Sequence, residues 1–215
     1  MDHDPAAPTL TLLGAVGCGS AIVEAALELA QVPYRLEMLD EPWNEGDARE
    51  RLRAVNPLLQ VPTLLLPGGA VMTETAAMVL YLADLAPEAG LVPAAGEAAR
   101  PAFLRWLVYL VASLYPSFTY GDVPSRYVSE KAAQDQLRAS TDAQREAMWR
   151  QVEGAAAGPW FLGERLSAID LYLWAMVRWR PRRPWFTAEA PKIAAIAAAL
   201  DADPRLAGVK ARNFP

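Results

Sequence analysis

The chain has 215 residues, 53% of them apolar, and can therefore bury one large hydrophobic core or two small ones. Its 20 basic and 25 acidic residues leave a net charge of −5, which gives no general attraction to nucleic acid or to an anionic membrane. No apolar run reaches the roughly 18 residues of a membrane span, and the start, MDHDPAAP, does not resemble a signal peptide. We therefore expect a cytoplasmic protein that binds neither nucleic acid nor membranes.

The first 85 residues predict strands that alternate with helices. The expected strands are residues 9–15, 34–38, 63–66 and 71–72, and the expected helices are residues 21–30, 47–55 and 76–85. Glu24 and Glu28 lie off the apolar stripe of the first helix. Strands joined through a helix run parallel, whereas the Pro67-Gly68-Gly69 turn makes an antiparallel pair. The pattern predicts a small mixed sheet with helices, as in thioredoxin-like domains.

The second part of the chain predicts helices and no convincing strand. A stretch rich in proline, glycine and alanine, residues 87–97, is the best candidate for a linker. Beyond it, helical spacing or composition marks residues 101–114, 130–156, 168–178 and 192–202. We therefore expect a thioredoxin-like domain over residues 8–86 and an all-α domain over residues 98–215.

Ser167 and Asp170 stand at the start of one of these helices. The spacing S-x-x-D before an apolar run predicts that the hydroxyl caps the helix and that the carboxylate bonds back to the cap. We expect this pair to be structural and to take no part in catalysis.

Cysteine and histidine usage narrows the chemistry. Cys18 is the only cysteine and His3, in the N-terminal tail, is the only histidine. An internal disulfide is therefore excluded, and we expect no Ser-His-Asp or Cys-His arrangement and no histidine-rich metal site on the folded body. A reactive thiolate would need a helix N-terminus, backbone N–H groups or hydroxyls to activate it. Cys18 lies just before a predicted helix, whose macrodipole would lower the pKa of the thiol.

The segment from Asn56 to Thr75 predicts a binding edge. Val61 precedes Pro62, so its backbone is held extended and can pair with an extended ligand by strand addition. X-Pro is also the one bond type for which the cis form costs little. Glu74 and Thr75 place a carboxylate, a hydroxyl and the first free helical N–H groups together. Such a site can bind both the ammonium and the carboxylate of an amino-acid-like group.

Taken in this order and spacing, these motifs resemble the cytosolic glutathione transferase family, bacterial type, over nearly the whole chain. The resemblance rests on Val61-Pro62, on Glu74-Thr75, on the Gly-Cys-Gly-Ser turn and on the Ser167–Asp170 box. It implies a thioredoxin-like domain followed by an all-helical domain, glutathione as co-substrate without a metal, and a homodimer.

The resemblance also assigns roles to single residues. Val61 would pair with the cysteinyl part of glutathione beside a cis Pro62, Glu74 and Thr75 would bind its γ-glutamyl end, and Gln60 is a weaker candidate for the same ligand. The residue that acts on the sulfur would be Cys18 or Ser20, or backbone N–H groups would serve alone. Tyr109 and Tyr115 would line the electrophile pocket, although ordinary helix packing explains them equally well.

Three functions follow as hypotheses. The first is a detoxifying glutathione transferase that activates the glutathione thiolate for attack on a small apolar electrophile. The second is a monothiol disulfide reductase or deglutathionylating enzyme that acts through Cys18, because a cysteine beside the bound peptide can form a mixed disulfide with it. The third is a non-catalytic binding or assembly module of the same fold.

Overall fold

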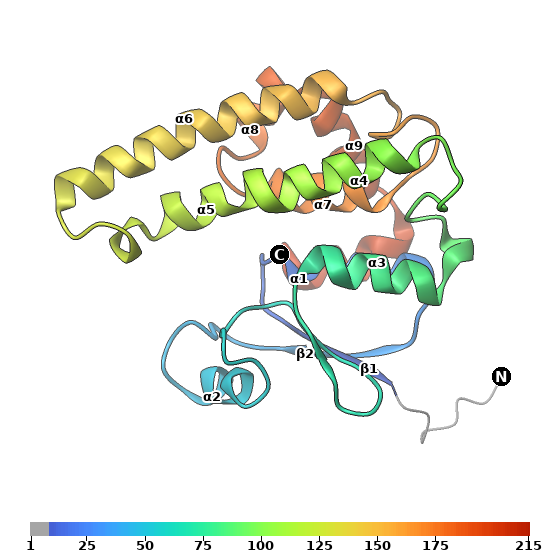
Figure 1. The fold of residues 1–215 in the computed structure, drawn as a ribbon, viewed down its shortest axis with the longest axis horizontal. Coiled ribbons are helices and arrows are strands. Elements are labelled where there is room, and N and C mark those ends of the chain that lie inside the picture. The colour runs from blue at the N-terminus through green and yellow to red at the C-terminus, as the bar shows by residue number, and fades with distance from the viewer. Residues whose placement is uncertain (1–8) are drawn as a thin grey trace. The chain divides into compact units, whose positions relative to one another are not determined.

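A computed structural model describes residues 9–215 and divides them into two compact units, which Figure 1 shows as ribbons. Unit 1 contains the described residues up to Leu91 together with Asp203–Pro215, and unit 2 is Val92–Ala202. His3 and residue 8, where the first domain was expected to begin, lie outside the described residues. The division differs from the expected helical domain of residues 98–215, because the C-terminal segment belongs to unit 1.

Unit 1 is built on a four-stranded sheet in the order β2-β1-β3-β4. The strands are β1 (Leu10–Gly14), β2 (Tyr34–Met38), β3 (Thr63–Leu65) and β4 (Val71–Met72). β1 runs parallel to β2 and antiparallel to β3, and β3 runs antiparallel to β4. The mixed sheet and the thioredoxin-like fold predicted from the sequence are thus confirmed.

The helices of unit 1 are α1 (Ser20–Ala30), α2 (Asp47–Arg53), α3 (Thr75–Leu85) and α10 (Ala207–Asn213). α1 is buried on every face over its first two turns and packs against β1, α3 and α10. Small residues such as Ala21, Ala25 and Ala26 allow this close approach from several sides. The apolar stripe predicted for this helix therefore describes only part of its buried surface.

Glu24 explains why the C-terminal segment belongs to unit 1. Its side chain is fully buried in α1, and its carboxylate accepts hydrogen bonds from Arg212 Nε at 2.7 Å and from Asn213 Nδ2 at 2.6 Å. A buried carboxylate is stable only with such partners. No sequence pattern indicated this long-range pairing, so the last residues were expected in the helical domain.

The helices of unit 2 are α4 (Arg100–Tyr109), α5 (Tyr115–Asp122), α6 (Lys131–Ala155), α7 (Ala168–Met176), α8 (Arg183–Glu189) and α9 (Pro191–Asp201). A π-helical segment, Leu110–Leu114, joins α4 to α5, so that the helix predicted to end at residue 114 continues (Figure 1). Short 3-10 turns cover Pro87–Ala89, Pro124–Arg126 and Pro204–Leu206. α8 and α10 were not predicted, since helices of seven residues depend on packing more than on propensity.

The capping box at the start of α7 is present as predicted. Asp170 Oδ2 accepts hydrogen bonds from the Ser167 amide at 2.7 Å and from Ser167 Oγ at 3.0 Å, and Asp170 Oδ1 accepts one from the Phe161 amide at 2.8 Å. Asp170 is fully buried, and this burial raises the pKa of its carboxyl to about 6. The carboxyl joins the loop before α7 to the helix N-terminus.

Candidate functional site

The strand registers bring four segments of unit 1 to one edge of the sheet, here called the site edge. At that edge β1 ends at Gly14, opposite the end of β2 at Met38, and β3 begins at Thr63, opposite Leu13. β4 also ends there, because Met72 pairs with Leu64 of the antiparallel β3. Along this edge the order is therefore the segment after β2, the segment after β1, the segment before β3 and the segment after β4.

Val61 and Pro62 immediately precede β3 at the site edge. The peptide bond between them is cis, Pro62 is buried and Val61 is half-buried. Within the part of the chain that the structure describes, no hydrogen bond engages the backbone N–H or C=O of Val61. An extended ligand can therefore pair with this residue as sequence reasoning proposed.

Asn56 holds the turn that presents Val61. It is buried, and its Nδ2 donates hydrogen bonds to the Gln60 carbonyl at 3.0 Å and to Thr63 Oγ1 at 2.9 Å, while its Oδ1 accepts one from the Leu58 amide at 3.0 Å. The sequence analysis assigned Asn56 to the predicted binding edge but gave it no role of its own. Asparagine before a proline is a signal for such a turn and could have identified it.

Glu74 and Thr75 begin α3 at the same edge. β3 and β4 are antiparallel neighbours, so the segment that follows β4 and the segment that precedes β3 lie at the same end of this strand pair. The first hydrogen bond of the helix runs from the Met78 amide to the Glu74 carbonyl at 3.0 Å, which leaves the amides of the first turn open. Glu74 is exposed with a φ of 67°, and its carboxylate has no partner among the described residues.

Gln60 is exposed beside this edge, and its side chain has no hydrogen bond to any residue that the structure describes. Only its carbonyl is engaged, by Asn56 and by Thr63 Oγ1 at 2.8 Å. The side chain is therefore available to a ligand, and its role stays a prediction.

Cys18 lies in the turn between β1 and α1, two residues before the helix begins. Its amide donates a hydrogen bond to the Ala15 carbonyl at 3.2 Å, its carbonyl accepts one from the Ala21 amide at 3.2 Å, and its side chain is half-buried. Burial raises the pKa of the Cys18 thiol. Burial therefore acts against the lowering of this pKa expected from the helix macrodipole, and that lowering stays a prediction.

Ser20 is fully engaged within the same turn. It is buried, and its Oγ donates a hydrogen bond to the Ala15 carbonyl at 3.1 Å and accepts one from the Ala15 amide at 3.2 Å. A hydroxyl has a single proton to donate. This geometry favours a role for Ser20 in shaping the turn over direct contact with a sulfur atom.

Two backbone amides at the start of α1 have no hydrogen-bond partner among the residues that the structure describes, and both belong to buried residues. No hydrogen bond within the described residues engages the N–H of Gly19 or Ser20. They point to the third possibility left open by the sequence, in which backbone N–H groups at a helix N-terminus hold a negative atom.

Tyr109 and Tyr115 belong to unit 2 and are packed against other aromatic rings. The Tyr109 ring lies 5.2 Å from that of Trp106, and its hydroxyl donates a hydrogen bond to Gln151 Oε1 at 3.1 Å. The Tyr115 ring lies 5.2 Å from that of Trp179. Both tyrosines stay predictions as pocket residues, because these contacts are also those of ordinary helix packing.

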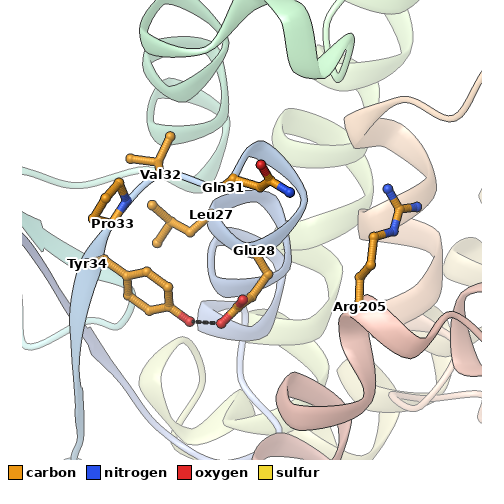
Figure 2. A pocket seen from close by; sticks show the side chains of 7 residues that line it. All are labelled: Leu27, Glu28, Gln31, Val32, Pro33, Tyr34 and Arg205. Carbon is orange, nitrogen blue, oxygen red and sulfur yellow. Dashed lines mark hydrogen bonds between the residues drawn. The ribbon is translucent and has the colours of Figure 1, made fainter. Parts of the chain in front are cut away.

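Unit 1 has cavities at both ends of its sheet. One, of about 380 Å³, lies at the site edge and is lined by Val16, Met38, Leu39, Asp40, Glu41 and Trp43. Figure 2 shows another, at the end of α1 and the start of β2, which is lined by Leu27, Glu28, Gln31, Val32, Pro33, Tyr34 and Arg205. In it the Tyr34 hydroxyl donates a hydrogen bond to Glu28 at 2.7 Å, and burial raises the Tyr34 pKa. The second cavity contains none of the predicted site residues.

Within residues 9–215, no helix is long and apolar enough to cross a membrane. The same described residues contain no cluster of three or more His, Cys, Asp or Glu side chains able to hold a metal ion.

Known proteins resemble this chain in sequence. Residues 20–85 match the profile described as "Glutathione S-transferase, N-terminal domain". The "Uncharacterized GST-like protein YncG" of Escherichia coli K12 is 40% identical over 205 residues, which cover 95% of this chain and 98% of that protein. The glutathione S-transferase GstA of Escherichia coli O157:H7 is 33% identical over 130 residues, 59% of this chain and 60% of that protein.

Solved structures extend the similarity to the whole fold. A Sulfitobacter glutathione transferase homolog with bound glutathione is 28% identical, with a TM-score of 0.83 over 97% of this chain and 100% of that chain. A sphingomonad glutathione S-transferase complexed with glutathione is 25% identical, with a TM-score of 0.78 over 95% of this chain and 100% of that one. The fold is thus that of a glutathione-transferase-type protein. The chain belongs to the glutathione S-transferase family, as the sequence motifs had predicted.

Proposed function

We propose that this protein is a glutathione transferase that binds glutathione along the site edge and holds its thiolate for attack on a small apolar electrophile. The observation that carries the proposal is the unpaired backbone of Val61, which lies at the same edge of the sheet as the N-terminus of α3. Two relatives of the same fold were solved with glutathione bound, which supports the choice of ligand.

The peptide is bound by groups that the unliganded protein leaves unused. The cysteinyl residue of glutathione pairs with the N–H and C=O of Val61, next to the cis Pro62. The γ-glutamyl ammonium binds the Glu74 carboxylate, and the γ-glutamyl carboxylate binds the Thr75 hydroxyl and the free amides of α3. Gln60 adds a side-chain amide beside the same peptide.

The sulfur lies against the Cys18 turn in this proposal. The open N–H groups of Gly19 and Ser20 stabilise the glutathione thiolate, and the N-terminal end of α1 adds its positive partial charge. Ser20 keeps the turn in shape through Ala15, and Cys18 stays a neutral thiol beside the site. The electrophile is bound by aromatic residues of unit 2, with Tyr109 and Tyr115 as the named candidates.

A monothiol reductase is the second candidate function. In its favour, Cys18 is a free thiol in the same turn, so its thiolate can attack the glutathione sulfur of a glutathionylated substrate, release the substrate as a thiolate and form a mixed disulfide with glutathione. Against it, the raised pKa leaves less thiolate at neutral pH to attack a disulfide. We therefore place conjugation first, thiol transfer second and a non-catalytic binding role third. A cytoplasmic homodimer that serves detoxification completes the proposal by family likeness.

Calorimetry with glutathione, together with conjugation to a chloronitroaromatic electrophile, tests the proposal. Glu74→Gln keeps the size of the side chain and removes its charge, so it should weaken glutathione binding by about 1.5–3 kcal/mol. Asp84→Asn, an equal charge change at the exposed far end of α3, is the matched control and should leave the affinity unchanged. Equal affinities in all three proteins would reject the binding site, and binding without any conjugation would leave thiol transfer and the non-catalytic role.

A further inference from the structure

The cavity of about 380 Å³ at the site edge lies on the β2 side of the Cys18 turn. Val16 of that turn forms one wall, Met38 and Leu39 at the end of β2 form another, and Asp40, Glu41 and Trp43 of the following loop complete it. Val16 is 55% exposed and Trp43 is 52% exposed, so two large apolar side chains face solvent at one opening. Neither the family likeness nor the proposed site assigns a ligand to this loop.

The strand order gives the direction in which a bound peptide runs. With the γ-glutamyl group at the start of α3, after β4, and the cysteinyl group at Val61, before β3, the glycine end continues toward β1 and β2. Adjacent strands are about 4.8 Å apart, so β2 lies about 10 Å from β3. The glycine residue of glutathione, when extended, spans only about 3.4 Å of that distance. The glycine carboxyl therefore reaches only the opening of the cavity, and a group attached to that carboxyl enters it.

The lining of the cavity suits a positive group and not a carboxylate. Its two charged members are both acidic, and Asp40 is exposed with no partner among residues 9–215. Glu41 accepts one hydrogen bond, from Asn44 Nδ2 at 2.8 Å to Oε2.

Arg49 of α2 is the cation that contacts this loop, and it is already engaged. Its guanidinium donates a hydrogen bond to the Trp43 carbonyl at 3.0 Å and lies 3.3 Å from the Glu45 carboxylate. The Trp43 ring contacts no other aromatic ring or cation within the described part of the chain, which leaves it open to an ammonium group.

We infer that this cavity binds an ammonium group carried on the glycine end of a glutathione-type thiol, as when the glycine carboxyl is amidated by a diamine or polyamine. The amide removes the carboxylate that Asp40 and Glu41 would repel, and the distant ammonium lies between these carboxylates and the Trp43 ring. This inference rests on the proposed binding of glutathione along the site edge.

The experiment compares three ligands by calorimetry at low ionic strength: glutathione, its 4-aminobutyl amide and its butyl amide. The two amides have the same length and differ in the ammonium group alone. The wild-type protein should bind the aminobutyl amide about fivefold or more tightly than the butyl amide. The preference should shrink as salt is added, because the carboxylates are exposed.

Variants of the cavity residues test whether the preference for the aminobutyl amide arises in the cavity. Asp40→Asn combined with Glu41→Gln should reduce the preference to about twofold or less. Each of these changes alone should reduce it in part, and Trp43→Leu should also reduce it. Asp84→Asn, which removes one charge at the exposed far end of α3, is the control for the single changes and should keep the full preference.

The outcomes separate the inference from the function on which it rests. Equal binding of both amides, or a preference that survives loss of both Asp40 and Glu41, overturns the inference. The proposed function still stands after such a result if glutathione binds and Glu74→Gln weakens glutathione binding. Failure of all three ligands to bind overturns both.

Discussion

Asn213 Nδ2 donates a hydrogen bond to Glu24 Oε2 at 2.6 Å, across 189 positions of the chain. The carboxylate has no exposed surface, and Arg212 is its other partner. α1, the helix that this pair ties to α10, also carries the turn with Cys18 at its N-terminal end. The last residues of the chain therefore support the helix on which the proposed sulfur site depends.

Asn213→Ala should destabilise the protein by about 1–3 kcal/mol, because it leaves a buried carboxylate short of a donor. Urea unfolding measures the loss. Arg205→Ala removes an exposed ion pair with Asp203 in the same C-terminal segment and should change the free energy of unfolding by less than about 1 kcal/mol. Similar losses of unfolding free energy in both variants would show that the buried Asn213–Glu24 pair stabilises the protein no more than the exposed ion pair does.

Ser20→Ala should destabilise the turn by about 1–3 kcal/mol, since the Ala15 amide and carbonyl both lose their partner. The folded fraction should still conjugate glutathione, because backbone N–H groups are proposed to hold the sulfur. Steady-state kinetics at a temperature where the variant is folded measure whether conjugation is retained. Loss of turnover with a normal KM for glutathione would instead make the hydroxyl a direct partner of the sulfur.

Alkylation of Cys18 should follow an apparent pKa above that of an exposed thiol, because burial disfavours the thiolate. The rate of reaction with iodoacetamide as a function of pH measures it, and bound glutathione should slow the reaction. Cys18→Ala should keep conjugation, and Cys18→Ser should abolish any disulfide reduction. An apparent pKa below about 8 would contradict the structure and favour thiol transfer.

Ser167→Ala should cost about 0.5–2 kcal/mol of stability through loss of the helix cap, with glutathione affinity unchanged in the folded protein. Thermal unfolding and calorimetry on the same preparation give both values. A normal unfolding midpoint together with lost activity would move this residue from a structural role to the active site.

The stability contributed by Asp170 should depend on pH. Its folded-state pKa of about 6 lies above the ordinary value of 3.8, so the folded protein holds a proton that the unfolded chain has released between these values. The stabilisation is complete below about pH 4 and is lost as the pH rises through 6, a change of up to about 3 kcal/mol. Urea unfolding of the wild type and of Asp170→Asn at pH 4, 5, 6 and 7 should show their difference shifting in this direction. A difference that does not vary with pH would contradict the shift.

Patterns that depend on neighbouring residues were readable from the sequence. Alternation over residues 34–38 predicted a strand and S-x-x-D predicted the capping box, and both are present. The cis bond implied for Val61-Pro62 is also present, whereas the binding edge of Val61, Glu74 and Thr75 stays a prediction. For the strand and the capping box, the spacing of side chains is set by the backbone period, which the sequence displays directly.

The tertiary structure alone decided which groups are buried and what they contact. Glu24 lies off the apolar stripe of its helix, yet α10 covers it, and the thiol of Cys18 is desolvated at a position where the helix alone would favour the thiolate. The Ser20 hydroxyl is bound to Ala15, and the ends of β1 and β2 join Val16 to Asp40 and Trp43 around one cavity. Desolvation and pairing depend on segments far apart in the chain, so no local pattern could predict them.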